Sequence, residues 1–193
     1  NKSYITVDEK FGWVFGKFFA DGNITKKNKN GVQWNSGISF ATHSNEIEQR
    51  QIIEDYFVDY GVNVVHTKHI GENCYSTTIT NGQIGRTFGD WKTANTSLNI
   101  PVFINESNSS VRSSFLAGLA DGDGCLHHKN IVMVCTVYDD LRDDVTNLYA
   151  SLGVASHYLT TKREVWKDIH KVTIKGLSNK RNLIRLLSPY TNK

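Results

Sequence analysis

Two aspartates in two copies of one short motif are the residues of this chain whose types and spacing could do chemistry. The stronger copy, LAGLADGDG at 116–124, ends in Asp123 and Gly124, and a weaker copy, VFGKFFADG at 14–22, ends in Asp21 and Gly22 about a hundred residues upstream. Carboxylate oxygens are the ligands that a hard cation such as Mg²⁺ prefers. A bound cation can polarise an ester and activate water. The pair therefore indicates metal-assisted hydrolysis by a duplicated chain.

Each copy is predicted to be a helix that ends at its Asp-Gly step, because glycine is a favoured C-terminal stop. In each copy a glycine is followed four residues later by a second small residue, Gly16 by Ala20 and Gly118 by Gly122. Each helix therefore has a smooth stripe on one face. Two such helices can approach backbone to backbone, a steric logic best known between membrane helices. This packing would bring the two acidic residues to the same end of the helix pair.

The composition is that of a globular protein. At 193 residues, with 39% apolar and 21% charged residues, the chain fits one domain or two small ones. No apolar run approaches the ~18 residues of a membrane span, and the first residues lack a signal-peptide pattern. The three cysteines have no CxxC spacing, which argues against a disulfide framework and a zinc site. We expect an intracellular protein without a membrane partner.

The net charge is only +3, so its distribution is more informative than its total. Lysine and arginine cluster in 26–29, 162–171 and 175–181, and acidic residues concentrate in 46–59 and 139–144. This segregation allows one basic and one acidic face, as a nucleic-acid binder requires. Charge alone fits a solvated surface without a function equally well.

The two halves repeat one order of elements downstream of the Asp-Gly steps. Each half is predicted to contain a hairpin, an amphipathic helix, a second hairpin and a further helix, with an Asn30-Gly31 turn as the clearest hairpin signal. In the first half these are 24–28, 33–42, 47–60, 62–68, 75–80 and 82–91. In the second half they are 125–128, 131–136, 141–152, 154–161, 168–175 and 177–187. With the motif helices, each repeat is an α+β unit of order αββαββα.

The duplication predicts the domain organisation. We expect an N-terminal repeat over 1–98, a linker over 99–110 and a C-terminal repeat over 111–193. A polar composition and Pro101 mark the linker region.

Strand alternation predicts which side chains leave the sheets. In 33–40, the apolar Trp34, Ile38 and Phe40 are expected to face the helices, while Gln33, Asn35 and Ser39 face outward. In the last hairpin Val172 and Ile174 are expected inside, with Lys171, Thr173 and Lys175 outside. Such polar side chains hydrogen-bond base edges and phosphates, and a two-stranded ribbon fits the DNA major groove. The alternative is an antiparallel sheet with one ordinary solvated face.

With the paired motif and the duplicated order of elements, the chain resembles the LAGLIDADG homing endonucleases in their single-chain form with two repeats. The second motif fits the consensus at Leu116, Ala117, Gly118, Leu119, Asp121, Asp123 and Gly124, and the first keeps Gly16, Ala20, Asp21 and Gly22. The segment Asn99-Ile100-Pro101 before the second motif is similar to the intein-associated branch. No splicing elements flank the repeats, so we expect an endonuclease alone, free-standing or excised from a larger reading frame.

The resemblance implies a fold and an activity. The motif helices would form the interface between the repeats, and two antiparallel sheets would form a saddle over a long, nearly asymmetric site in double-stranded DNA. Both strands would be hydrolysed, one phosphodiester each. A monomer with pseudo-twofold symmetry would suffice, because one chain supplies both repeats.

The resemblance also assigns site residues. Asp21 and Asp123 would bind Mg²⁺, with Mn²⁺ or Ca²⁺ able to substitute in binding, and the carbonyls of Ala20 and Gly122 would be further ligands. Members of the family often place a lysine near each scissile phosphate. Leu98 stands where the intein-associated branch has it, so Lys92 and Lys193 are the candidates here.

The candidate DNA contacts are polar or basic residues of the predicted strands and hairpin loops. They are Lys27, Lys29, Gln33, Asn35, Ser39, Lys68, Tyr75, Thr77, Lys162, Arg163, Lys171, Thr173 and Lys175.

Three alternatives remain at this stage. The first is a non-cleaving nucleic-acid binder on the same fold, such as an intron-splicing maturase or a repressor. The second is a structural duplication in which the acids only end their helices. The third, a calcium loop at 121–124, is weak because no Glu follows at the twelfth position. Asp121 has Phe19 as its counterpart, so a structural or capping role is expected for it.

Overall fold

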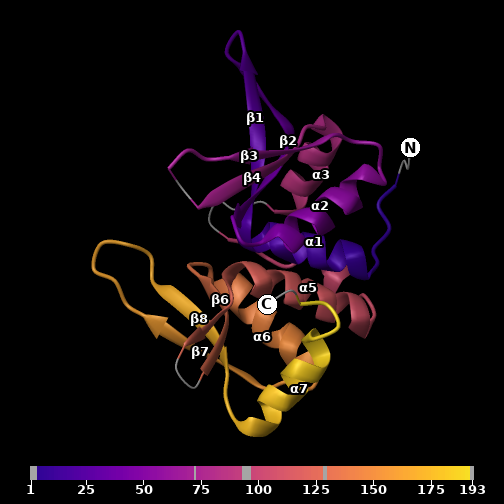
Figure 1. The fold of residues 1–193 in the computed structure, drawn as a ribbon. Coiled ribbons are helices and arrows are strands. Elements are labelled where there is room, and N and C mark those ends of the chain that lie inside the picture. Colours follow the sequence, from indigo (N-terminus) through magenta and orange to yellow (C-terminus); the bar gives the residue numbers. More distant parts are fainter. Residues whose placement is uncertain (1–3, 72, 93–96, 128–129, 192–193) are drawn as a thin grey trace. The chain divides into compact units, whose positions relative to one another are not determined.

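The protein divides into two compact units in a computed structural model that describes residues 4–71, 73–92, 97–127 and 130–191. One unit contains 21–92, and the other contains 7–20 together with the described residues between 97 and 191 (Figure 1). The first motif helix thus packs with the second unit, except for its last residue, Asp21. The division into repeats at 1–98 and 111–193 follows sequence similarity instead and stays a prediction.

The first unit is a four-stranded antiparallel sheet with two helices. Its elements are β1 (Gly22–Lys29), β2 (Val32–His43), α2 (Ile47–Val58), β3 (Val64–Lys68), β4 (Cys74–Ile79) and α3 (Gly82–Trp91). The strand order is β1-β2-β4-β3. Aromatic rings form the core between sheet and helices, with the Phe57 ring 6.3 Å from that of Phe40 and 6.0 Å from that of Phe88. The Asn30-Gly31 turn has positive φ at both residues, 54° and 79°, as a tight hairpin requires.

The second unit repeats this pattern and adds the motif helices. Its elements are α1 (Glu9–Asp21), α4 (Val102–Asn105), α5 (Ser109–Asp123), β5 (Cys125–His127), β6 (Asn130–Thr136), α6 (Asp139–Ser151), β7 (Ser156–Thr161), β8 (Ile169–Ile174) and α7 (Leu177–Leu187). The strand order is β5-β6-β8-β7, the same as in the first unit. The predicted fold class, a duplicated α+β arrangement with two antiparallel sheets, is confirmed. The short helix α4 lies within the predicted linker, whose polar composition does not indicate a helix.

The two motif helices lie backbone against backbone. A Cβ built on Gly16 of α1 would fall 2.0 Å from the carbonyl oxygen of Phe115, and one on Gly118 of α5 would fall 2.0 Å from that of Trp13. Gly12 lies against Val111 and Ser114, one turn earlier on both helices, so α1 and α5 run parallel. The glycines of the predicted stripe, Gly16 and Gly118, therefore lie in the contact surface, and the C-terminal ends of the paired helices point the same way.

Among the described residues, no helix is both long and apolar enough to cross a membrane.

Candidate metal and nucleic-acid site

The carboxylate of Asp123 stands where a helix changes directly into a strand. Gly124 closes α5 by donating its N–H to the carbonyl of Ala120 at 2.8 Å, and its backbone is already extended, with φ −76° and ψ 147°. A Cβ on Gly124 would lie 2.3 Å from the Ala120 oxygen. Glycine is thus needed here for β5 to begin immediately, which holds the half-buried Asp123 at the junction.

Asp21 occupies the equivalent junction, as the last residue of α1 before β1 begins at Gly22. Lys92 donates from its Nζ to the Gly22 carbonyl at 2.8 Å. Lys92 is the C-cap of α3, a helix whose start is fixed by Asn81, which accepts from the N–H groups of Gln83 and Ile84. The structure therefore brings one of the two predicted lysines to the residue that follows Asp21.

The second predicted lysine, Lys193, lies outside the described residues. Leu98, at the position where the intein-associated branch has its lysine, is only 5% exposed. An apolar, buried side chain thus fills that place in this chain.

Asp121 has a structural role. The residue is only 1% exposed, and its two carboxylate oxygens accept hydrogen bonds from different elements. The indole Nε1 of Trp13 in α1 donates to Oδ2 at 2.8 Å, and the Thr191 hydroxyl beyond α7 donates to Oδ1 at 2.5 Å. This arrangement supports the structural role expected for Asp121, because the carboxylate joins both motif helices to the C-terminal segment.

A β-bulge corrects the orientations predicted for the hairpin of the first unit. The register of β1 and β2 shifts between Thr25 and Lys26, so the alternation of β2 reverses beyond Ser36. Trp34, expected inside, is 42% exposed. Asn35, expected outside, turns toward α3 and donates to the Gly85 carbonyl at 3.4 Å. Ile38 and Phe40 are fully buried and Ser39 faces away from them, as predicted.

Two candidates on β4 also face the helices, contrary to the prediction. Thr77 is fully buried and its hydroxyl lies 2.8 Å from Nδ1 of His66. Tyr75 has the Arg50 guanidinium over its ring at 4.4 Å. Both share the face of the buried Ile79 because strand side chains alternate with a period of two. Ser76 and Thr78 occupy the outward positions, which the alternation from Ile79 could have revealed.

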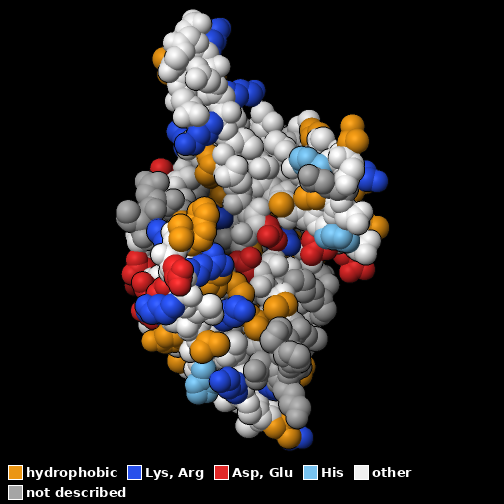
Figure 2. Space-filling view, turned by 90° about the vertical axis from the view of Figure 1, so that its left-hand side faces the viewer, with side chains coloured by type: hydrophobic (Ala, Val, Ile, Leu, Met, Phe, Trp, Pro, Cys, Tyr) orange, Lys and Arg blue, Asp and Glu red, His pale blue; other side chains and the backbone are white. Residues whose placement is uncertain are grey.

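Most of the remaining candidates are accessible, but Thr173, predicted to lie outside, is buried. Exposed lysines follow the projecting β1–β2 hairpin, where Figure 2 shows basic side chains along its length. The exposed candidates are Lys27, Lys29, Gln33, Lys68, Lys162, Arg163 and Lys175. Lys162 forms an ion pair with Asp168 at 2.6 Å. Lys171 is half-buried on β8, and Thr173, two residues on, is 8% exposed and donates its hydroxyl to the His157 carbonyl at 3.3 Å.

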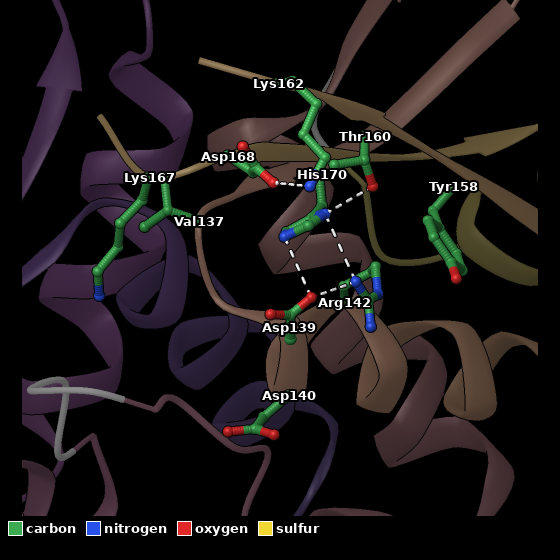
Figure 3. A pocket seen from close by; sticks show the side chains of 10 residues that line it. All are labelled: Val137, Asp139, Asp140, Arg142, Tyr158, Thr160, Lys162, Lys167, Asp168 and His170. Carbon is green, nitrogen blue, oxygen red and sulfur yellow. Dashed lines mark hydrogen bonds and ion pairs between the residues drawn. The ribbon is translucent and has the colours of Figure 1, made fainter. Parts of the chain in front are cut away.

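A polar hollow lies on the helix side of the second sheet, and several of its side chains pair with one another. His170 lies 3.3 Å from Asp139 and 3.0 Å from the Thr160 hydroxyl, and Arg142 contacts both Asp139 and His170 (Figure 3). Arg142 also lies 4.5 Å from the centre of the Tyr158 ring. His170 shares a face with the buried Val172, so this hollow lies on the side of the sheet that the helices cover. Its charges serve to fasten α6 to the sheet.

Within the described ranges, no group of three or more His, Cys, Asp or Glu side chains could hold a metal ion. A single carboxylate at a helix end can still fit Mg²⁺, which usually keeps several waters and takes one or two carboxylates together with substrate phosphates. The donor chemistry at Asp21 and Asp123 therefore fits a cation that shares its ligands with a phosphodiester.

Comparisons with known proteins place this fold in a class. The family model described as "Homing endonuclease" matches residues 99–186, which include the second motif and most of the second repeat. No curated protein sequence matches the chain significantly. The resemblance to the LAGLIDADG homing endonucleases is confirmed by this match together with the structural relatives, whereas similarity to the intein-associated branch stays a prediction.

The structural relatives cover nearly the whole chain. I-DmoI in complex with DNA and Mn has a TM-score of 0.71 and 14% identity, over 97% of this chain and 99% of that chain. A variant of I-DmoI with its target DNA in the presence of Mg has a TM-score of 0.70 and 16% identity, over 94% and 97%. Full-length DUF199/WhiA from Thermatoga maritima has a TM-score of 0.63 and 11% identity, over 97% and 57%. At these identities the likeness shows the fold.

Proposed function

We propose that this protein is a site-specific endonuclease that recognises a long asymmetric site in double-stranded DNA and hydrolyses one phosphodiester in each strand. The observation that carries the proposal is the pair of Asp-Gly helix ends on two closely packed helices of a duplicated fold. A pure binder has no need to hold two carboxylates where they would face phosphates. The structural relative I-DmoI is a homing endonuclease that forms a complex with its target DNA, which supports the same activity.

Asp21 and Asp123 are the proposed metal-binding acids, with the carbonyls of Ala20 and Gly122 beside them. A bound Mg²⁺ would supply Lewis-acid activation of the phosphodiester and of the attacking water. The tight helix ends at Gly22 and Gly124 hold each carboxylate at a fixed point, so the chain itself contributes position more than proton transfer. Relatives described with Mn, Mg and Ca support a requirement for a divalent cation.

The proposed DNA contacts combine two kinds of residue. Exposed lysines of the hairpins, such as Lys27 and Lys29, would bind phosphates and provide affinity. Outward polar side chains, such as Ser39 on β2, would meet base edges. A monomer that acts where the host DNA lies would be sufficient for this activity.

The experiment uses a supercoiled plasmid that carries the joined coding sequences from either side of the reading frame, because the uninterrupted gene would contain the recognition site. The proposal expects the purified protein to linearise this plasmid in Mg²⁺, and to leave it intact in EDTA. A control plasmid without the insert should stay supercoiled. Specific binding in a gel-shift assay without cleavage in Mg²⁺ or Mn²⁺ would instead favour the alternative, a non-cleaving binder.

A further inference from the structure

A row of three residues crosses the outward face of the second sheet beside the end of α5. On β6, Cys135 is the direct cross-strand partner of Lys171 on β8. Their chain neighbours, Val134, His170 and Val172, are buried toward the helices, so Cys135 and Lys171 both face outward. This is the face on which DNA contacts are proposed.

The register of β5 brings Asp123 to the same row. Cys125 is the partner of Val132 and the strands are antiparallel, so the residues before Cys125 run alongside those after Val132. Asp123 is the last residue of α5, two residues before Cys125, and when this register is extended with the extra residue of the β6 bulge between Val132 and Val134, it runs alongside Cys135. With neighbouring strands ~4.8 Å apart, the backbones at Asp123 and Lys171 are separated by about two strand spacings. The long lysine side chain can extend across that distance over the small, exposed Cys135.

The electrostatics of Cys135 agree with this order. Partial desolvation is the main cause that raises the pKa of the Cys135 thiol; the positive charge of Lys171 opposes this, and the neighbouring Cys125 and the negative charge of Asp123 add to it. Both charges therefore act on the same sulfur atom, as expected if they flank it.

We propose that Lys171 is the cationic catalytic residue of the second repeat, which contacts a non-bridging oxygen of the phosphate that is cleaved at Asp123. The assignment rests on the proposed function. During hydrolysis the water oxygen forms a bond to phosphorus and its proton passes to solvent. One P–O ester bond breaks with its electron pair on the leaving oxygen, which takes a proton from water. Between the attack of water and the departure of the leaving oxygen, negative charge accumulates on the non-bridging phosphate oxygens. Lys171 stabilises this charge without losing its own proton.

The two repeats supply the cation near the acid from different elements. Ile79 and Ile174 hold corresponding places in the central strands β4 and β8, paired with Ile38 and Ile131. Lys171 lies three residues before Ile174, and Ser76 holds the corresponding position three residues before Ile79. In the first unit the cation near the acid comes instead from Lys92 at the end of α3. Lys92 and Lys171 are therefore not related by the duplication.

The experiment follows each strand separately, on a supercoiled target plasmid that the wild-type protein linearises. That linearisation tests the proposed function before any variant is compared. Lys171→Met is expected to slow cleavage of one strand at least 10-fold, so that the nicked circle accumulates, and always with the same strand cut. Binding in Ca²⁺ should change by less than about threefold, because the variant neutralises only one phosphate fewer than the wild type. Lys171→Arg should keep most of the activity.

A matched control and a rescue separate catalysis from folding or binding. Lys10→Met removes an exposed lysine in the first turn of α1, away from the sheet, and should leave both strand rates equal. Cys135→Lys in the Lys171→Met background places an ammonium nearer to Asp123 and should restore the slow strand. Equal rates for both strands in Lys171→Met, or an equal decrease on both strands that follows weaker binding, would overturn the assignment.

Discussion

The indole nitrogen of Trp13 lies 2.8 Å from a carboxylate oxygen of Asp121, so a buried hydrogen bond joins the two motif helices 108 residues apart. Asp121 stands two positions before the candidate metal ligand Asp123. The structure thus uses the first acid of the motif to hold the helices together and leaves the second at the helix end. This division of roles explains how Phe19 can replace the first acid in the other copy, while the second acid is present in both copies, as Asp21 and Asp123.

Breaking this bond should destabilise the protein. Trp13→Phe keeps an aromatic ring but removes the donor to a buried carboxylate, which is expected to cost about 1.5–3 kcal/mol of unfolding free energy. Asp121→Asn should cost a similar amount, and the two changes together should cost clearly less than their sum, because they remove one interaction. Urea unfolding of the four proteins measures this coupling. Full additivity would show that the hydrogen bond contributes nothing.

The close helix packing predicts a strong effect of one methyl group. Gly118→Ala would put a Cβ 2.0 Å from the Trp13 carbonyl oxygen, so the helices must separate. A decrease of more than about 2 kcal/mol in unfolding free energy is expected, at or above the usual cost of overpacking a core. Gly82→Ala is the control, because a Cβ there meets nothing nearer than 3.5 Å. Similar unfolding midpoints for both variants would contradict the tight crossing.

Asp144 should make the stability depend on pH in the mildly acidic range. Burial raises the pKa of this carboxyl. The hydrogen bond that it accepts from the Ile100 N–H, at 2.7 Å, opposes this rise. A carboxyl with a raised folded pKa contributes stability that is present below its unfolded pKa and is lost as the pH rises through the folded pKa. The stability of Asp144→Asn relative to the wild type should therefore increase from about pH 3 to pH 6. A difference that is constant over this range would contradict the burial of the ionised group.

The hairpin lysines should contribute affinity without sequence preference. Lys27→Ala with Lys29→Ala is expected to weaken binding to target and non-target duplexes by similar factors. The slope of log K against log salt should become shallower by about 0.9 for each phosphate that the variant no longer neutralises. Lys10→Ala, which removes an exposed lysine outside the strands, is the control. An unchanged salt slope would mean that this hairpin does not meet the DNA backbone.

The duplicated fold was predictable because its signals are local and occur twice. Asp-Gly helix ends, the Asn30-Gly31 turn and amphipathic helices ended by glycine each follow from backbone preferences of single residues. The outward faces were less predictable. The bulge opposite Thr25 and Lys26 reverses the sides of the sheet on which Trp34 and Asn35 lie. No residue type in that segment predicts the bulge. The predictions for the buried Thr77 and the ring-stacked Tyr75 are wrong because a polar side chain on a strand need not be exposed.

The proposed catalytic cation, Lys171, illustrates a second limit of sequence reasoning. Leu98 and Lys193 are positions that the distance along the chain from the motifs indicates. Lys171 is 48 residues from Asp123 in sequence, and only the register of β5, β6 and β8 brings the two to one row. Pairing across strands is a non-local property, so spacing in the sequence could not supply it.

The most direct test of the account is to measure cleavage of both strands of the target plasmid by Asp21→Asn, Asp123→Asn and the double variant, with binding measured in Ca²⁺. Each asparagine is nearly isosteric with aspartate but removes the charge that holds the cation. The account predicts that every variant binds the target within about tenfold of wild type, whereas linearisation in Mg²⁺ falls by at least 10³-fold, as expected when a metal-binding group is removed. Linearisation by the double variant at a rate near that of wild type would contradict the central claim that these two helix-end carboxylates carry the hydrolysis.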